Sequence, residues 1–446
     1  MTTDIRTTQP RRIAVVGAGI AGMGAALALS ERHDVTLFEG SDRAGGHADT
    51  ATIEYPMAGG PRPVSVDTGF IVYNAKTYPN LTALLAHLEA PTKWSDMSLG
   101  FSIDGGAVEW AGDNLNKIFG QRRNLVRPRF IRMAREVLRF NREAEAALQA
   151  GGQDEPIGAW LDARGFDETF RRWYLYPMAG AIWSTRSGDV AGFPALALFA
   201  FYRNHELFAG LGDAVQWRTV DGGSRAYVSK VEERLGARLV KGRAVERVDP
   251  GPVLRFADGT SEAFDEVVLA THSDEALALL PSADREVGSL LGDVRYAPNE
   301  AWLHRDARLM PKRRRVWSSW NAMTGGDAER DGASVTYWMN RLQGIDRAMP
   351  LFVSLNPAEP PRQDTVFKVA SYAHPQFDSA AFAAQAGMDA VQGRGGVWFA
   401  GAWLGYGFHE DGLRSGLRVA EALGARPDWA RDTGMPLADA RSAEAA

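Results

Sequence analysis

The chain opens with a change in the spacing of its apolar residues. Residues 12–16 form a short apolar run, a glycine-rich turn follows, and apolar residues then recur at helical spacing over 23–31. A second apolar run covers residues 34–38. Strand, glycine turn, helix and strand within about 30 residues make one β-α-β unit. The pattern therefore predicts an α/β fold with a parallel sheet at this end of the chain.

Two later regions have the same character and extend the predicted domain. Residues 227–271 predict a helix, a strand, a hairpin around Asp258-Gly259 and a buried strand, and residues 396–423 predict a strand before a helix that starts near Asp411. Two long insertions rich in Trp, Phe and Tyr separate these pieces. We therefore predict a discontinuous Rossmann-type domain from residues 1–75, 215–280 and 390–425, a mixed-sheet plus helical substrate domain from residues 76–214 and 281–389, and a frayed tail at residues 426–446.

Composition narrows the class of protein. A chain of 446 residues with 45% apolar and 24% charged residues is folded and too long for one core. Its net charge of -5 argues against a nucleic-acid partner. The absence of cysteine excludes disulfides, thiolate metal ligands and a flavin tethered through sulfur. No metal motif, signal peptide or spanning segment is evident, which predicts a cytoplasmic protein without a metal.

The first turn has the spacing of a dinucleotide site. Three glycines allow a tight turn, close approach of backbone amides to a pyrophosphate, and close packing of helix on strand. The helix N-terminus adds a positive dipole end. Glu39 closes the second strand 22 positions after Gly17, where a carboxylate can accept hydrogen bonds from a ribose and disfavours NADP. The candidate phosphate-binding residues are Gly17, Gly19, Ile20, Ala21 and Gly22.

Further small-residue motifs favour FAD over NAD. A second glycine pair in 43–47 lets backbone pass close to a pyrophosphate, and Arg43 can neutralise phosphate. The stretches 67–70, 399–402 and 407–416 supply similar strand ends and turns. Together these motifs resemble the FAD-dependent amine oxidase and phytoene desaturase superfamily.

The resemblance implies non-covalent FAD and a role for each matching residue. Glu39 would hold the adenosine ribose, Val245 would contact adenine, and the helix near Asp411 would direct its N-terminus at the flavin. The glycine pair and His47 would line the flavin. Beyond the first turn, the implied cofactor residues are Glu39, Gly40, Arg43, Gly45, Gly46, His47, Thr68, Gly69, Phe70, Val245, Thr271, Gly401, Phe408, His409, Gly412 and Leu413.

The substrate is predicted from two departures from the amine oxidase pattern and from the aromatic residues of the insertions. Phe408 stands where amine oxidases usually place one ring of an aromatic cage, and Phe suits hydrocarbon better than a cation. The strand expected at residues 296–304 carries no lysine where amine oxidases often hold one. We predict that an acyl chain is lined by aromatic residues, with core packing as the alternative for each. These residues are Trp183, Phe199, Tyr202 and Phe408.

Within the superfamily, four stretches resemble a bacterial branch that includes the methylated fatty-acid desaturase of furan fatty acid biosynthesis. They are residues 301–311, 317–321, 337–340 and 407–412. The branch implies desaturation of a methyl-branched unsaturated acyl chain of a phospholipid, by hydride transfer to flavin N5 and proton transfer to a base. Candidate bases are His409, Glu410 and Tyr73, with His47 as an outside candidate.

Four alternatives to this function stay open. The same fold could oxidise an amine, a porphyrinogen or a carotenoid, or it could be a non-catalytic lipid escort protein.

Between Gln121 and Arg142 there are eight arginines and one glutamate. A helix from Pro128 would put Arg132, Arg135, Arg139 and Arg142 on one face, for an anionic membrane surface or simply for solvent. A peripheral position on the membrane is therefore open, as are the oligomeric state and the electron acceptor.

Overall fold

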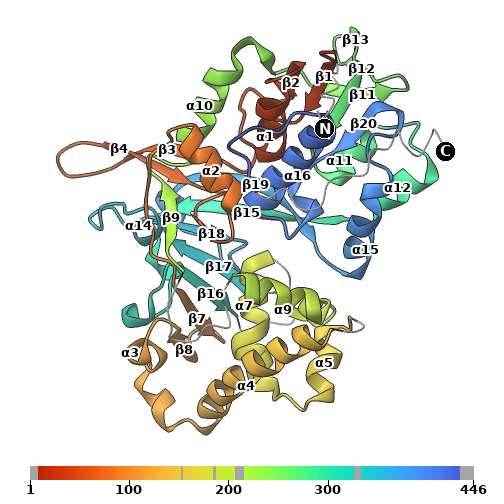
Figure 1. Ribbon diagram of the computed structural model, residues 1–446. Helices are drawn as coiled ribbons and strands as arrows, with labels where there is room; N and C mark the ends of the chain where they lie inside the picture. The colour runs from red at the N-terminus through yellow and green to blue at the C-terminus, as the bar shows by residue number, and fades with distance from the viewer. Residues whose placement is uncertain (1–8, 152–153, 184–186, 206–214, 326–332, 432–446) are drawn as a thin grey trace.

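The computed structural model describes residues 9–151, 154–183, 187–205, 215–325 and 333–431. Its upper part in Figure 1 is built around a parallel sheet, and its lower part around a mixed sheet with helices packed at its side. The predicted fold class, α/β with a Rossmann-type domain and a mixed-sheet plus helical second domain, is confirmed. Residues 432–446, most of the predicted tail, lie outside the described residues.

The upper sheet has five parallel strands, drawn from three separate parts of the chain. β1 lies at its centre and pairs in parallel with β2 and β14. Its order is β10 (Leu239–Lys241), β2 (Asp34–Glu39), β1 (Arg12–Val16), β14 (Glu266–Leu269) and β20 (Val397–Phe399). Central parallel strands are buried on both faces, which explains the unbroken apolar runs seen in the sequence.

Helices and a small sheet cover the two faces of this parallel sheet. One face packs against α1 (Ile20–Leu29), α2 (Pro79–His87), α10 (Arg225–Leu235) and α16 (His409–Ala422). The other packs against α11 (Ser273–Ala278), α12 (Arg285–Gly292), α15 (Ser379–Gly387) and an antiparallel sheet of β11 (Val245–Asp249), β12 (Val253–Phe256) and β13 (Ser261–Ala263). α1 begins three residues before the predicted start, because the glycine turn ends at Gly19 and not at Gly22.

The lower sheet has seven strands, of which only β7 and β16 are parallel neighbours. Its order is β19 (Val366–Gln376), β15 (Arg295–His304), β18 (Phe352–Leu355), β17 (Ala333–Trp338), β16 (Trp320–Thr324), β7 (Leu99–Ile103) and β8 (Val108–Ala111). Two small antiparallel sheets join the parts: β3 (Thr50–Tyr55) with β4 (Arg62–Asp67), and β5 (Tyr73–Asn74), β9 (Trp217–Val220) and β6 (Thr92–Trp94).

Aromatic side chains hold the lower helices together. The ring of Phe140 in α4 lies at the centre of this packing. Its centroid is within about 6 Å of the centroids of aromatic rings from α5, from α9 and from the segment between them. The helices are α3 (Leu115–Ile118), α4 (Pro128–Ala150), α5 (Ile157–Ala163), α6 (Glu168–Phe170), a π-helical turn (Arg171–Leu175), α7 (Tyr176–Trp183), α8 (Ser187–Val190), α9 (Ala195–Asn204) and α14 (Met339–Leu342). Across the described ranges, no helix combines the length and the apolar content needed to cross a bilayer.

The packing bears on where the two domains divide. α2 follows residue 75, yet Leu81, Leu84 and Leu85 are buried in the core on one face of the parallel sheet. α12 and α15 likewise contribute to the core on its other face. The predicted division therefore stays a prediction, and this packing favours a nucleotide-binding domain that also includes these three helices.

Candidate active site

The glycine turn has the geometry that a pyrophosphate needs. A Cβ added to Gly22 would lie 1.9 Å from the carbonyl oxygen of Gly17, so α1 can pack here only on a glycine. At Gly19 an added Cβ would meet no atom within 4 Å, and no side chain caps the helix. Open space therefore adjoins the N-terminus of α1, which is where backbone amides and the helix dipole bind phosphate. The residues present fit a bound dinucleotide.

Glu39 lies directly beside this turn. One carboxylate oxygen accepts a hydrogen bond from the Ala18 N–H at 2.9 Å, and the other accepts from the N–H and hydroxyl of Ser41, both at 2.9 Å. A carboxylate accepts about four hydrogen bonds, so it retains capacity for a ribose hydroxyl. Gly40 lies against Ala244, the residue before Val245. The predicted ribose and adenine residues thus lie together at the carboxyl end of β2.

The second glycine pair packs onto the first turn. The Gly45 N–H donates to the carbonyl of Ala18 at 2.8 Å, and a Cβ on Gly46 would lie 3.2 Å from the Cα of Gly19. Arg43 was predicted to neutralise phosphate. Its guanidinium donates instead to the carbonyl oxygens of its own loop, at Ala44, Gly46 and Ala48.

α16 packs against α1 through small residues. A Cβ on Gly416 would lie 2.3 Å from the carbonyl oxygen of Ala21, and one on Gly412 would lie 2.9 Å from Ile20. Leu413 is fully buried, and its side chain fills the space beside Gly24. The Gly401 N–H donates to the hydroxyl of Ser415 at 2.8 Å. The N-terminus of α16 is therefore held close to the N-terminus of α1.

Each of the three predicted bases is engaged within the protein. The ring of His409 stacks on Phe70 at 3.8 Å, its Nε2 lies 3.3 Å from the hydroxyl of Tyr227, and burial lowers its pKa to about 3. Glu410 accepts hydrogen bonds from the N–H groups of Asn80 and Leu81 and from the Asn80 amide, so it caps α2. Tyr73 is only 2% exposed, within the core beside the parallel sheet.

A second group of rings surrounds His47, and sequence analysis found only His47 itself. Its ring stacks on Tyr372 at 5.0 Å and lies 5.5 Å from His374 and 5.9 Å from His272. Burial lowers the pKa of His47 and brings that of His374 to about 4. We call His47, His272, His374 and Tyr372 the histidine cluster. These segments are far apart in the chain, so no local pattern could have revealed it.

A carboxylate and a lysine extend the histidine cluster. The Tyr372 hydroxyl lies 2.8 Å from the hydroxyl of Thr68 and donates to Asp49 at 3.1 Å. Lys368 donates to the same carboxylate at 2.7 Å. Lys368 on β19 is paired with Leu303 of β15. The strand expected at residues 296–304, which is β15, does lack a lysine. Its neighbour β19 supplies Lys368.

The predicted substrate residues separate into two groups that contact different rings around α9. Phe408 stacks on Phe201 at 5.3 Å, and Trp183 lies 4.5 Å from the same ring. Phe199 and Tyr202 are fully buried and pack on Phe140 of α4. Phe408 contacts both the upper and the lower core, so the rings of Phe408, Phe201 and Trp183 form a wall between the two parts, here called the aromatic wall. Phe201 lies in the aromatic stretch considered for an acyl chain but was not among the four residues predicted to line it.

The aromatic wall and the histidine cluster adjoin. A Cβ on Gly407 would lie 3.1 Å from the ring of Phe377 and 3.6 Å from Pro375. Pro375 directly follows His374 on β19, and Gly407 directly precedes Phe408. Apolar rings and titratable groups are thus brought to one region beside the predicted flavin residues. Among the described residues, no group of three or more His, Asp or Glu side chains could hold a metal ion.

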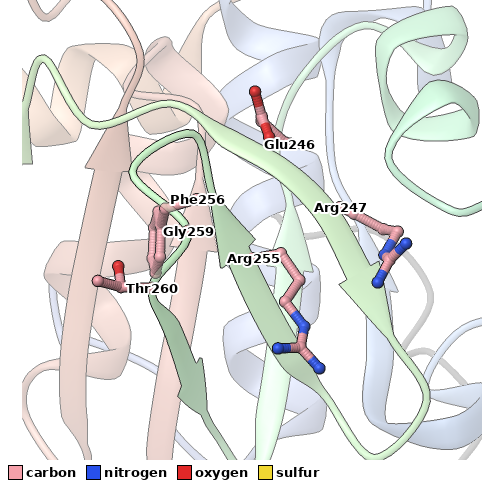
Figure 2. A pocket seen from close by; sticks show the side chains of 6 residues that line it. All are labelled: Glu246, Arg247, Arg255, Phe256, Gly259 and Thr260. Carbon is pink, nitrogen blue, oxygen red and sulfur yellow. The ribbon is translucent and has the colours of Figure 1, made fainter.

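An open hollow on the surface lies outside this region. It has a volume of about 390 Å³ and is lined by β11, β12 and the following turn, as Figure 2 shows. Two of its lining residues, Arg247 and Arg255, both pair with Asp249 at 2.7 Å. The hollow is therefore a feature of the hairpin next to Val245, and its two arginines share one carboxylate.

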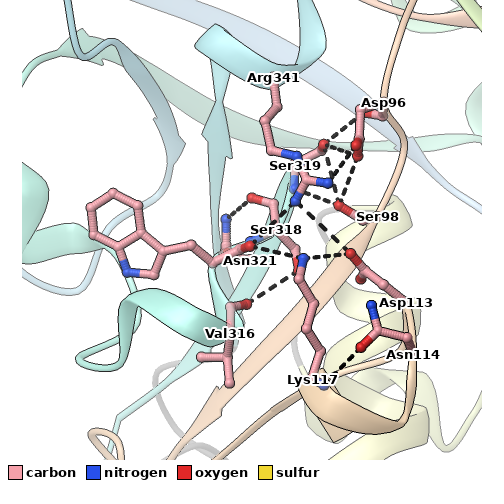
Figure 3. Close-up of polar contacts among 11 residues, drawn as sticks. Asp96, Ser98, Asp113, Asn114, Lys117, Val316, Ser318, Ser319, Asn321 and Arg341 are labelled. Atoms are coloured by element: carbon pink, nitrogen blue, oxygen red, sulfur yellow. Dashed lines mark hydrogen bonds and ion pairs between the residues drawn. The ribbon is translucent and has the colours of Figure 1, made fainter. Parts of the chain in front are cut away.

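The motif at residues 317–321 has a structural role. Figure 3 shows its polar groups joined to Asp96 and Ser98, just before β7, and to Lys117 of α3. Asn321 donates to the carbonyl oxygens of Ser318 and Thr336, and the Ser319 hydroxyl donates to Asp96. Asp96 also pairs with Arg341. Because Ser318, Ser319 and Asn321 are completely buried, their hydrogen bonds hold β16 in place.

Comparisons of sequence agree with this picture. Residues 15–88 match the family model described as an NAD(P)-binding Rossmann-like domain. The chain is 27% identical over 264 residues to AofH of Mycobacterium tuberculosis, which is named as a flavin-containing monoamine oxidase. That match covers 56% of this chain and 55% of AofH, so it spans about half the length of this relative. A 46-residue segment is 52% identical to the L-amino-acid oxidase of Pseudechis australis, covering 10% of this chain and 9% of the oxidase.

Solved structures of the same fold extend over nearly the whole chain. A CLA-producing fatty acid isomerase from P. acnes has a TM-score of 0.65 at 14% identity, covering 92% of this chain and 97% of the isomerase. Putrescine oxidase bound to putrescine has a TM-score of 0.64 at 16% identity, and the match covers 94% of this chain and 99% of the oxidase. Cyclohexylamine oxidase from Brevibacterium oxydans has a TM-score of 0.65 at 16% identity, covering 93% and 98%. The chain is thus a homologue of a protein named as a flavin-containing monoamine oxidase, with a Rossmann-like dinucleotide-binding domain and the fold of the FAD amine oxidases.

Proposed function

We propose that this chain is an FAD-dependent oxidoreductase that dehydrogenates an acyl chain. The observation that carries the proposal is the aromatic wall, in which Phe408 and Phe201 stack face to face where the two cores meet. Stacked phenyl rings bind hydrocarbon by burial of apolar surface and attract a cation less than Tyr or Trp does. The relatives named above as flavin-containing or as a fatty acid isomerase are compatible with this class of reaction.

The finer proposal concerns the lipid. By its resemblance to the methylated fatty-acid desaturases, the substrate is a methyl-branched unsaturated acyl chain of a phospholipid. Two C–H bonds break and one C=C bond forms, and two electrons and two protons leave the chain. Bound FAD would accept the electrons as a hydride equivalent. The protein residues must then orient the chain, exclude water and accept the remaining proton.

The proton acceptor is assigned by this proposal to the histidine cluster. A general base needs an available lone pair near the reacting carbon, and neutral imidazoles supply it. The lowered pKa values of His47 and His374 keep both rings neutral near pH 7. His409 is bound between Phe70 and Tyr227, so it serves better as a positioning residue for the start of α16.

The first test is anaerobic reduction of the purified flavoprotein. Phosphatidylglycerol with methyl-branched monoenoic chains should bleach the flavin band, and mass spectrometry should find a lipid lighter by two hydrogens. The matched control is the same lipid with straight saturated chains, which should not bleach it. Bleaching by an amine or a porphyrinogen alone would instead support one of the alternative oxidases. A protein that takes up no FAD would support the escort protein.

The two sides of α9 provide a matched pair of variants. Phe408→Ala removes half of the aromatic wall, and we expect it to raise KM for the acyl lipid at least tenfold. Phe199→Leu changes a ring that packs only in the helical core, so it should lower the melting temperature while KM stays near the wild-type value. Equal effects of both variants on KM would contradict the assignment of the wall.

A further inference from the structure

Basic segments of the chain meet at the lower end of the molecule. This end lies around α3, β8 and the start of α4, away from the parallel sheet (Figure 1). Arg123 and Arg127 both donate to the carbonyl oxygen of Ala107, in the turn between β7 and β8. Arg313 donates to the carbonyl oxygen of Gly106 in the same turn. Residues 122–127 and 312–315, which are far apart in the sequence, are therefore neighbours.

The positive charges at this end are mostly not neutralised. Arg313 pairs with Glu109, Arg132 with Asp167, and Arg139 with Glu143. Nine other cations have no ion pair within the described ranges, and all of these except Arg127 are exposed: Arg122, Arg123, Arg127, Arg129, Arg135, Arg142, Lys312, Arg314 and Arg315. The pKa of Arg127 is lowered by burial and by the charges of Arg123 and Arg313. Such crowding in a chain of net charge -5 indicates a local anion-binding surface.

Large aliphatic side chains are exposed among these cations. Leu125 and Val126 are 52% and 83% exposed, and they lie between Arg123 and Arg127. Leu115 is 63% exposed at the start of α3. On α4, Leu138 is 67% exposed, three residues after Arg135 and four before Arg142, so all three share one face. The described residues include only two other exposed large hydrophobic side chains, Trp94 and Val369.

The structure corrects the basic face predicted for α4. Of the four arginines placed on one face, Arg132 and Arg139 are paired with acidic residues, and Arg139 also covers the ring of Phe166 at 3.8 Å. Arg135 and Arg142 remain available with Leu138 between them. The available surface is thus the start of α3, residues 122–127, the loop 312–315 and one stripe of α4. We call it the basic tip.

We propose that the basic tip docks on an anionic lipid bilayer, with its arginines at the headgroups and its four aliphatic side chains at the headgroup–acyl boundary. Exposed aliphatic residues among arginines suit a bilayer, because the two kinds of side chain reach two depths. A nucleic acid would use the arginines but give the aliphatic side chains no apolar environment, and single-strand binding relies on aromatic stacking. Apart from Asn114 and Asn116 beside Leu115, the exposed side chains of the basic tip are aliphatic or cationic.

The test is flotation of the full-length flavoprotein with vesicles of phosphatidylcholine, alone or mixed with phosphatidylglycerol. We expect binding only with the anionic lipid, and binding that weakens as salt rises. Arg122→Glu with Arg123→Glu should weaken it at least tenfold. Leu125→Ser with Val126→Ser leaves the charge unchanged and should weaken it several-fold. Arg32→Glu with Arg285→Glu changes the same charge on exposed residues of the upper part and should leave binding unchanged.

Three results would overturn the proposal. They are equal binding to both kinds of vesicle, equal losses in the control and tip variants, and binding to a single-stranded oligonucleotide in place of vesicles. Thermal unfolding of each variant separates loss of binding from loss of fold. The readout needs no turnover, so this inference and the proposed acyl substrate succeed or fail separately.

Discussion

Two glycines of the first turn are limited by different neighbours. A Cβ at Gly22 would meet the protein itself, at 1.9 Å from the carbonyl oxygen of Gly17. A Cβ at Gly19 would meet open space, where the φ of -74° suits any residue. Gly22 is therefore required by the packing of the fold, and Gly19 leaves room for a ligand beside the helix.

This difference predicts opposite outcomes for two alanine variants. Gly22→Ala should destabilise the apoprotein by several kcal/mol, because helix and strand must separate. Gly19→Ala should leave the apoprotein melting temperature unchanged but weaken FAD binding at least tenfold, measured by titration of flavin fluorescence. Gly59→Ala, where a Cβ also meets nothing, is the control for both. Normal FAD binding by Gly19→Ala would remove the turn from the cofactor site.

The two histidine assignments differ in their expected pH profiles. His374→Phe removes a proposed proton acceptor, so kcat should fall at least a hundredfold and the acidic limb of the profile should change. His409→Ala should leave the flavin bound and lower kcat less than His374→Phe does. The acidic limb of the profile should stay unchanged, because this ring positions α16. Stopped-flow reduction from about pH 3.5 to pH 9 covers the acidic limb expected for a pKa of about 4 and measures both. A lost acidic limb in His409→Ala alone would return the base to His409.

At the scale of elements, α16 and α2 depend on one another. The Glu410 carboxylate of α16 accepts three hydrogen bonds at 2.8 to 3.0 Å from the first turn of α2. Helix N-termini are stabilised by such an acceptor and by its negative charge. The acidic residue that sequence analysis assigned to catalysis thus joins two helices of the same core.

We therefore expect Glu410→Gln to affect stability more than chemistry. Loss of the charge and of one acceptor oxygen should cost about 1–3 kcal/mol of unfolding free energy. The pH dependence of kcat should stay as in the wild type. Denaturant unfolding gives the first quantity, and Glu421→Gln, a half-buried carboxylate near the other end of the same helix that pairs with Arg426 at 2.7 Å, is the comparison for loss of a carboxylate charge. A hundredfold loss of kcat with normal stability would restore Glu410 as a base.

At the scale of the whole molecule, buried histidines make stability depend on pH. Burial lowers the pKa to about 4 for His205, His304 and His374, and to about 3 for His409. The unfolded chain binds these protons near pH 6.5, while the folded chain does not, so stability falls as pH decreases from 6.5 towards 4. Asp67 opposes this weakly, because burial raises its pKa to about 6.

The expected result is a melting temperature that is flat from pH 7 to 8 and falls steadily below about pH 6.5. His304→Gln should flatten part of this decline. This ring is not one of the histidine cluster and lies between the Ser354 hydroxyl and the Asp306 N–H, which donates to its Nδ1. Calorimetry of the apoprotein measures the curve. A melting temperature that rises on acidification would contradict the neutral state of these rings.

Much of the fold could be predicted from local patterns. β1 spans the predicted residues, β2 extends one residue beyond them, and α4 begins at the predicted proline. Apolar runs and Pro or Gly punctuation act over a few residues, so the pattern already contains the information. The dinucleotide turn was found for the same reason, since its glycines and Glu39 lie within one β-α-β unit.

Only the tertiary structure decided which side chains meet. The histidine cluster joins residues 47, 272, 372 and 374, Glu410 caps a helix more than 300 residues earlier, and Arg132 is neutralised by Asp167, which lies outside its helix. The sequence by itself determined the β-α-β unit and its cofactor class, because those depend on spacing along the chain. The surroundings of each base, ring and arginine were decided in three dimensions, because charge and burial depend on segments that only folding brings into contact.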